Sequence, residues 1–575
     1  MNSEGNWAEA TRKFQQDLSD SWSKALQGLP KMPGSELQPG GNGNGSGSLP
    51  QLAFAPDKLQ ALQQAYFEEA RQLWNQGLTQ AGTKVDKRFA GDAWSANPVA
   101  SFTASVYLLN ARALMGLAEA ADTDEKTRAR LRFAVEQWMA ASAPSNFLAL
   151  NAEAQKRAVE TRGESIAKGM QNLLTDMQQG HVSMTDESQF EVGKNVATSE
   201  GSVVFQNELF QLIEYKPTTA KVYERPFLVV PPCINKFYIL DLQPENSLIG
   251  YLVAQGHRTF VVSWRNPDEA MKDMTWDHYV GDGALKAIEV TREIGGQDKK
   301  GGQINALGFC VGGTILGTAL GVLAARGEKP VASATLLTTL LDFSETGVLD
   351  LFIDEPMVKY REMQMGKGGL LKGQELASTF SFLRPNDLVW NYVVGNYLKG
   401  ETPPPFDLLY WNSDSTNLPG PMYTWYLRNT YFENNLIKPG KLTVCGQKID
   451  LSEVDLPFYI YGSREDHIVP IVGAYASVAQ LPGKKRFVMG ASGHIAGVIN
   501  PPAKNKRSYW TNDKLPAAHG DWLAGAKEHA GSWWPDWANW LKPQGGKQVP
   551  APKAYGKGTY KAIEPAPGSY VKAKA

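Results

Sequence analysis

The sequence predicts an α/β fold with a mainly parallel sheet, preceded by an all-helical region. Between about residues 190 and 340, apolar runs of strand length alternate with helical patterns, which is typical of β-α-β units. The run Phe227–Val230 is continuously apolar, as expected of a strand covered on both faces. The third observation is a strand-to-helix junction with glycines at residues 304–313, near the middle of the predicted sheet.

Residues 1–185 are expected to form the N-terminal helical domain. Its apolar residues recur at spacings of three and four, and we interpret these stripes as helix-packing faces. The stripes are Leu59–Leu73, Phe102–Leu117, Leu131–Trp138 and Ile166–Met177. Before them, Asn6–Leu29 has an amphipathic pattern, and about residues 33–50 are rich in Gly, Asn and Ser, which predicts a flexible linker.

Residues 186–575 are expected to form the catalytic domain. Predicted strands lie at residues 203–205, 209–215, 227–230, 259–263, 304–309, 332–337, 456–461 and 486–489. Predicted helices lie at residues 247–255, 283–294 and 311–327, and three tryptophans between 533 and 540 mark a final helix. The tail 542–575, rich in Pro, Gly and Lys, is expected to be extended.

Between about residues 340 and 447 the alternation stops and aromatic side chains become dense. An insertion at this point of an α/β sheet lies above the edge where ligands bind. We therefore predict a lid or cap over an apolar substrate path, with a separate helical subdomain as the alternative.

Composition excludes several classes of protein. The net charge of −1 argues against bulk nucleic-acid binding, and the three cysteines in 575 residues do not form a disulfide framework. No apolar stretch approaches membrane-spanning length, and the histidines and cysteines show no paired metal-ligand spacing. The expectation is a cytoplasmic protein with no metal and no cofactor.

The junction at residues 304–313 resembles a nucleophile elbow. Gly308 and Gly312 stand two residues either side of Cys310, between a strand pattern and a helix pattern, as in the G-x-S-x-G turn of α/β-hydrolases with cysteine in place of serine. Glycines let the backbone pass close to neighbouring strands. A sulfur at a helix N-terminus is also favoured as thiolate. A buried structural cysteine is the alternative for the pentapeptide alone.

A catalytic triad follows from the order of the chain. In α/β-hydrolases the nucleophile is followed by an acid and then a histidine, each after a strand, and Cys310, Asp466 and His494 have that order. His494 is expected to take the thiol proton, and Asp466 to orient its ring. His467 is the rival base, but it adjoins Asp466 in sequence.

Two backbone N–H groups are expected to bind the oxyanion. One belongs to Val311, directly after the nucleophile, and the other to the loop Cys233–Asn235, where Ile234 is the candidate. Cys233 is an alternative nucleophile but lacks the elbow.

Five segments closely resemble the class I polyhydroxyalkanoate synthases of bacteria that store polyester granules. They are Gly308–Gly313, Pro231–Lys236, Ser381–Tyr392, Tyr461–Pro470 and Gly490–Pro502, and the resemblance extends from about Arg88 to Ala575. It implies an acyltransferase that polymerises (R)-3-hydroxyacyl-CoA, its substrate, with release of CoA. It also implies that Cys310, Asp466 and His494 are catalytic, that the protein is a homodimer, and that its N-terminal domain associates with the granule surface and granule-associated proteins.

Two alternatives stay open at this point. A thioesterase or polyester hydrolase of the same fold would use the same residues but release free hydroxyacid. A non-catalytic granule-coat protein would use the helical domain and the basic tail, and Cys310 would then be replaceable. Asp466 also has two alternative roles, because it either supports His494 or activates the incoming hydroxyl itself.

Overall fold

The structure, a computed structural model, describes residues 53–76, 86–297 and 301–575. The predicted helix Asn6–Leu29 and the linker 33–50 lie outside these residues. The chain divides into two compact units: one contains the residues up to Asp186 together with Phe380–Pro404, and the other contains Glu187–Thr379 and Pro405–Ala575.

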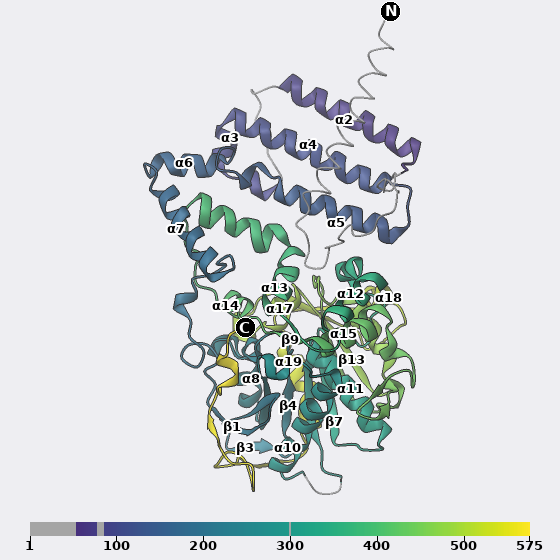
Figure 1. The fold of residues 1–575 in the computed structure, drawn as a ribbon. Coiled ribbons are helices and arrows are strands. Elements are labelled where there is room, and N and C mark those ends of the chain that lie inside the picture. Colours follow the sequence, from purple (N-terminus) through teal and green to yellow (C-terminus); the bar gives the residue numbers. More distant parts are fainter. Residues whose placement is uncertain (1–52, 77–85, 298–300) are drawn as a thin grey trace, which may run out of the picture. The chain divides into compact units, whose positions relative to one another are not determined.

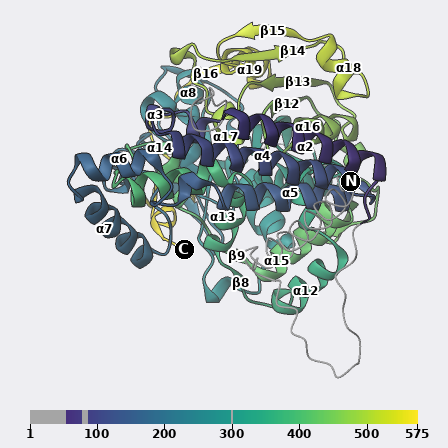
Figure 2. The ribbon, with the colours of Figure 1, turned by 90° about the horizontal axis from the view of Figure 1, so that it is seen from above.

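The first unit is helical. Its helices are α2 (Pro56–Gln76), α3 (Asp92–Ala96), α4 (Pro98–Ala120), α5 (Glu125–Ala141), α6 (Ala152–Glu160) and α7 (Glu164–Gln179). The long helices α2, α4 and α5 run side by side (Figures 1 and 2). Asn97 begins α4, because its side chain accepts hydrogen bonds from the N–H groups of Val99 and Ala100 ahead of a proline at the first helical position.

Residues 380–404, within the predicted insertion, are part of the helical unit. They include the π-helices η9 (Asn386–Trp390) and η10 (Val393–Leu398), and Figure 1 shows this green segment beside the blue α7. The Tyr397 hydroxyl donates to Asp176 Oδ2 at 2.6 Å, and the Asn172 amide donates to the Asn396 and Glu401 carbonyls at 3.0 Å. A Cβ at Gly169 would lie 2.1 Å from the Tyr397 carbonyl oxygen, so α7 must approach this segment at a glycine.

The apolar stripe of α7 differs from its expected role. Ile166, Met170 and Met177 are 41%, 56% and 71% exposed, so they are not a buried packing face. The helix packs instead through its glycine and its polar residues against residues 393–401. Polar pairing and a close backbone approach therefore replace the apolar contact that the spacing predicted.

The second unit is built on a mixed sheet with a parallel centre, as the sequence predicts. In spatial order its strands are β15 (Lys527–Ala530), β14 (Ser508–Thr511), β13 (Lys485–Gly490), β12 (Phe458–Ser463), β7 (Val331–Leu337), β6 (Ile304–Phe309), β4 (Phe227–Val230), β5 (Thr259–Trp264), β2 (Phe210–Tyr215), β1 (Gly201–Gln206) and β17 (Glu564–Pro565). The strands from β13 to β5 are parallel, and the outer ones pair antiparallel.

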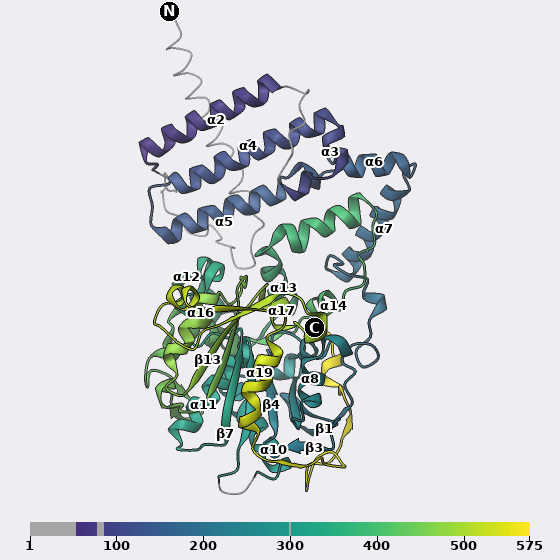
Figure 3. The same cartoon turned by 180° about the vertical axis from the view of Figure 1, so that it is seen from behind.

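Helices cover both faces of this sheet. Those that bound the core are α8 (Leu248–Ala254), α10 (Lys286–Ile294), α11 (Val311–Ala325), α16 (Ile471–Ala476), α17 (His494–Val498) and α19 (Trp534–Leu541). Leu228 of β4 belongs to the core that contains α10 and α11, and its neighbour Val229 belongs to the core that contains α8 and α19. Figure 3 shows α19 in front of the sheet. Burial on both faces explains why these strands are apolar throughout.

The predicted lid region leaves the sheet after β7. In the second unit it contains η8 (Gly347–Phe352), α12 (Glu355–Met365), β8 (Leu370–Leu371), α13 (Gly373–Phe382, which ends in the helical unit), α14 (Asp407–Ser413), β9 (Leu418–Pro419), α15 (Gly420–Tyr426), the π-helix η11 (Leu427–Phe432) and the hairpin β10–β11 (Thr443–Val444, Gln447–Lys448). Trp276 stacks on both Trp425 and Tyr426, at centroid distances of 4.9 and 5.3 Å, and so joins α15 to the segment after β5.

The tail is held against the sheet. β16 (Gln548–Pro550) pairs with β3 (Lys221–Tyr223), and β17 pairs with β1 at the edge of the large sheet. The Gln211 side chain further binds Glu564 and the backbone N–H groups of Ser569 and Tyr570. The final turn, η17 (Tyr570–Lys572), includes Val571, which is buried.

Candidate active site

Cys310 is the single residue between β6 and α11, and its backbone is strained. Its φ is 53° and its ψ −129°, a conformation that L-residues rarely adopt. The Cys310 N–H donates to the Leu337 carbonyl at 2.9 Å, and its carbonyl accepts from the Thr339 hydroxyl at 3.2 Å. The neighbouring strand β7 and the turn after it therefore hold the strained residue.

Gly308 and Gly312 stand where there is no room for a side chain. A Cβ at Gly308 would lie 2.4 Å from the Gly313 Cα, and a Cβ at Gly312 would lie 2.3 Å from the Val230 carbonyl oxygen. No side chain fits at either distance, so the sharp turn and the close passage past the end of β4 both depend on glycine. The result is a nucleophile elbow, which places the sulfur at the N-terminus of α11.

Asp466 and His494 follow the ends of β12 and β13, and the structure brings them together. His494 Nδ1 lies 2.7 Å from Asp466 Oδ2, and both side chains are buried. Asp466 Oδ1 accepts from the N–H groups of Ile468 and Val469, each at 2.8 Å. Because a carboxylate only accepts, Nδ1 of His494 carries the proton, and the other ring nitrogen remains for the nucleophile.

His494 lies close enough to Cys310 for the two side chains to interact electrostatically. Burial lowers the pKa of His494, but the charge of Asp466, the neighbouring Cys310 and the hydrogen bond with Asp466 outweigh burial and raise this pKa to about 10. Phe309 stacks on the imidazole at a centroid distance of 5.7 Å. The carboxylate and the imidazole are therefore hydrogen-bonded, and the sulfur lies within electrostatic range of the imidazole.

The two rival residues occupy different environments. His467 is half-buried directly after Asp466, and the imidazole bonded to that carboxylate is the one of His494. Cys233 is buried, and burial together with the neighbouring Cys310 raises the pKa of its thiol. A thiol held in its neutral form is a poor nucleophile.

The two predicted oxyanion donors lie on adjacent backbone segments. Val311 is the first residue of α11, so its N–H has no partner within the helix. Ile234 lies in the loop that follows β4, and the close approach of Gly312 to the Val230 and Pro231 carbonyls places this loop beside the elbow. Asn235 in the same loop pairs with Ser415 in an isolated antiparallel bridge.

Two tyrosines of the predicted lid belong to the site, although the sequence indicated only that the region is aromatic. Burial raises the pKa of the Tyr431 phenol, and nearby Cys310 and Asp466 raise it further. The pKa of Tyr426 is raised by burial and by the neighbouring Tyr431 and Cys310. Their rings meet edge to face at 5.6 Å, and Phe343 packs on Tyr431 at 5.0 Å. Their aromatic density was the only signal in the sequence.

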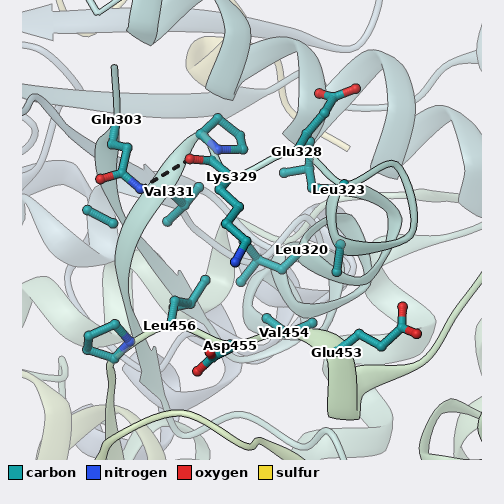
Figure 4. Close-up of a pocket in the computed structure, with 15 residues that line it drawn as sticks. Gln303, Leu320, Leu323, Glu328, Lys329, Val331, Glu453, Val454, Asp455 and Leu456 are labelled. Atoms are coloured by element: carbon teal, nitrogen blue, oxygen red, sulfur yellow. Dashed lines mark hydrogen bonds between the residues drawn. The ribbon is translucent and has the colours of Figure 1, made fainter. Parts of the chain in front are cut away.

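A cavity of about 140 Å³ lies at the opposite end of α11 (Figure 4). Its lining includes Gln303 before β6, Leu323 near the end of α11 and Val331 at the start of β7, and Gln303 donates to the Lys329 carbonyl. The 15 residues of α11 span about 22 Å at 1.5 Å per residue, and Cys310 is at the other end. This cavity is therefore separate from Cys310.

Among the described residues, no group of three or more His, Cys, Asp or Glu side chains is arranged to hold a metal ion. The same part of the chain contains no helix with the length and apolar character needed to span a bilayer. A strained cysteine on an elbow, followed in sequence by an aspartate and a histidine that come after later strands of a parallel sheet, is the arrangement typical of enzymes of the α/β-hydrolase fold class.

Comparison with known proteins narrows this class. A family model described as the N-terminus of poly-beta-hydroxybutyrate polymerase (PhaC) matches residues 85–252, and one for the alpha/beta hydrolase fold matches residues 226–501. The chain is 59% identical over 570 residues to the poly(3-hydroxyalkanoate) polymerase subunit PhaC of Cupriavidus necator, covering 96% of this chain and 94% of the relative. It is 42% identical over 536 residues to the poly(3-hydroxyalkanoate) polymerase of Methylorubrum extorquens, covering 90% and 88%.

The chain belongs to the poly(3-hydroxyalkanoate) polymerase family. The family and the fold expected from the sequence are thereby confirmed.

Proposed function

We propose that this chain polymerises (R)-3-hydroxyacyl-CoA into polyhydroxyalkanoate and releases CoA, through a thioester on Cys310. The observation that supports this most directly is the hydrogen-bonded pair of His494 and Asp466 near Cys310 on its elbow, in a chain 59% identical to a named polymerase. The CoA thioester is itself the activated substrate, so the proposed reaction uses no cofactor and no metal.

In the first half-reaction the Cys310 thiolate attacks the thioester carbonyl. His494 holds the proton taken from the thiol, and Asp466 stabilises the imidazolium. The N–H groups of Val311 and Ile234 are the proposed donors to the oxyanion of the tetrahedral intermediate. The bond from the carbonyl carbon to the CoA sulfur then breaks, and CoA leaves with the proton from His494.

In the second half-reaction a hydroxyl group of another hydroxyacyl unit attacks the thioester on Cys310. His494 takes the hydroxyl proton, an ester bond forms, and the Cys310 sulfur leaves as the thiolate. Direct activation of the hydroxyl by Asp466 is the alternative. Exchange of one thioester for another changes little in bond type, which suits a thiol nucleophile better than a hydroxyl.

Water competes with the hydroxyl in this second step. We propose that the aromatic cluster of Phe343, Tyr426 and Tyr431 is part of a movable cover that excludes water from the thioester. Its support is the position of both phenols within electrostatic range of the sulfur. We further propose a homodimer in the cytoplasm that associates with the polyester granule and granule-associated proteins through the helical unit.

The test is incubation with (R)-3-hydroxybutyryl-CoA, with CoA release and polymer mass measured in the same sample. A polymerase yields polymer in step with CoA. Free hydroxyacid in place of polymer would assign the chain to hydrolysis, and a lack of CoA release would remove Cys310 from acyl transfer altogether.

A further inference from the structure

The loop after β4 ends at a buried lysine. Lys236 is 2% exposed, and its ammonium group donates a hydrogen bond to the carbonyl of Ala573, near the end of the tail. Its own carbonyl accepts from Trp411 Nε1 at 2.7 Å, and its N–H donates to Asn235 Oδ1 at 2.7 Å. The loop that contains Ile234 is thus fixed at one end by segments far away in sequence.

A buried carboxylate stands beside this ammonium. Asp414 is 2% exposed, and Lys574 Nζ lies 3.2 Å from its Oδ1 while the Tyr238 hydroxyl donates to its Oδ2 at 2.9 Å. Burial lowers the pKa of Lys236, and Asp414 partly offsets this. A buried lysine is costly unless its ammonium group has a partner, and the Ala573 carbonyl is the hydrogen-bond acceptor here.

The last residues of the tail are held a second time. The Asn266 amide donates to the Lys574 carbonyl at 2.8 Å, and Asn266 Oδ1 accepts from the N–H of Asn417 at 3.0 Å. Lys574 also lies over the Tyr410 ring, 5.4 Å from its centroid. Ala573 and Lys574 therefore join the loop after β4, the segment after β5 and the region around α14.

We propose that Ala573 and Lys574 hold the loop Pro231–Lys236 in the position that aims the Ile234 N–H at the oxyanion, with Lys236 as the positioning residue. The inference rests on the proposed function, since it assigns a task within acyl transfer. Lys236 does not touch the reacting atoms. It acts by fixing the backbone, and the hydrogen bond from its ammonium group to Ala573 is the contact that the tail supplies directly.

Two rates measured at Cys310, that of acyl transfer and that of alkylation, distinguish a positioning role from general damage to the fold. Transfer from a thioester passes through an oxyanion, whereas alkylation of Cys310 by iodoacetamide is a displacement at carbon that forms none. Loss of an oxyanion donor typically lowers kcat by about 10²–10³-fold. A chain ending at Val571 keeps the buried Val571 and is expected to lose about 100-fold in kcat for CoA release, with KM and the Cys310 alkylation rate changed less than about threefold.

The matched control is a chain ending at Lys574. It keeps the acceptor oxygens of Ala573 and Lys574 and is expected to retain full activity. Lys236→Met removes the ammonium with little change of shape and is expected to reproduce the loss. The double variant, Lys236→Met in the chain ending at Val571, should be no slower than either single change, because both remove the same bond.

Asn266→Asp provides a second route, since it keeps the acceptor for Asn417 and loses the donor to the Lys574 carbonyl. We expect about a tenfold fall in kcat with unchanged alkylation, and this variant decides the matter if the shortened chain does not fold. Unchanged CoA release, or alkylation that falls in parallel with it, would overturn the proposal. A native chain that releases no CoA would instead contradict the proposed function.

Discussion

Nδ1 of His494 lies 2.7 Å from Oδ2 of Asp466, and this contact joins residues that are 28 positions apart and follow neighbouring parallel strands. Register explains the proximity, because Ser463 at the end of β12 pairs with Gly490 at the end of β13. The carboxylate fixes the tautomer of the imidazole and leaves its other nitrogen for Cys310. The sheet itself therefore places the acid beside the base.

Replacing Cys310, the proposed nucleophile, should abolish turnover without unfolding the chain. Cys310→Ala removes one half-buried sulfur and should leave the circular dichroism spectrum unchanged while CoA release and polymer both fall to background. Cys310→Ser should be nearly as inactive, because a hydroxyl is a far weaker nucleophile near neutral pH. Ample CoA release by either variant would exclude Cys310 as the nucleophile.

The two histidines should differ in their effect on the sulfur. His494→Gln removes the proposed base and should slow acylation by about 100-fold or more. His467→Gln is the matched control, because it alters the residue next to Asp466 without touching the observed pair. The rate of Cys310 alkylation by iodoacetamide reports the difference, and a larger fall in His467→Gln would reassign the base.

Stability should fall with rising pH because of His494. Its pKa is near 6.5 in the unfolded chain and is raised to about 10 in the folded chain, so the folded state keeps a proton that the unfolded state releases. This contribution to the free energy of unfolding is complete below about pH 6.5 and is lost as pH rises toward about 10.

Urea unfolding from about pH 6 to about pH 9 measures that slope. The native chain should lose more stability over this range than His494→Gln, in which the titrating group is absent. Equal slopes in the two proteins would show that His494 titrates normally in the folded state.

The aromatic cluster near the sulfur should act as a cover. Tyr431→Ala removes the ring that packs on Phe343 and Tyr426, and we expect faster alkylation of Cys310 and a larger share of free hydroxyacid among the products. Tyr431→Phe keeps the ring, loses the hydroxyl, and should behave more like the native protein. Product ratios that do not differ between the two variants would show that the cluster does not exclude water.

Much of this site could be predicted because its signals are local. Gly308 and Gly312 mark the elbow through close approaches that no other residue permits, and the order of Cys310, Asp466 and His494 reflects successive strands of a parallel sheet. The central strands were equally visible, since burial on both faces makes them continuously apolar.

The remainder depends on contacts between distant segments. The edge strands β14, β15 and β17 are short and only partly buried, so the sequence contains no apolar run from which they could be predicted. The position of Tyr431 beside Cys310 follows from how the insertion folds back, and the exposure of Met170 from the way α7 meets Tyr397 through Gly169. Spacing along the chain does not specify which segments meet in this way.

The membership of Phe380–Pro404 in the helical unit affects the order of folding during synthesis. Domains usually fold as they leave the ribosome, beginning with the first one made. Here Asp176 and Asn172 form hydrogen bonds with Tyr397 and Asn396, which are made much later. The first unit therefore stays incomplete until residues 187–379 have been translated. Its nascent helices must remain available throughout that interval, and cutting the chain after residue 186 would deprive both halves of a native partner.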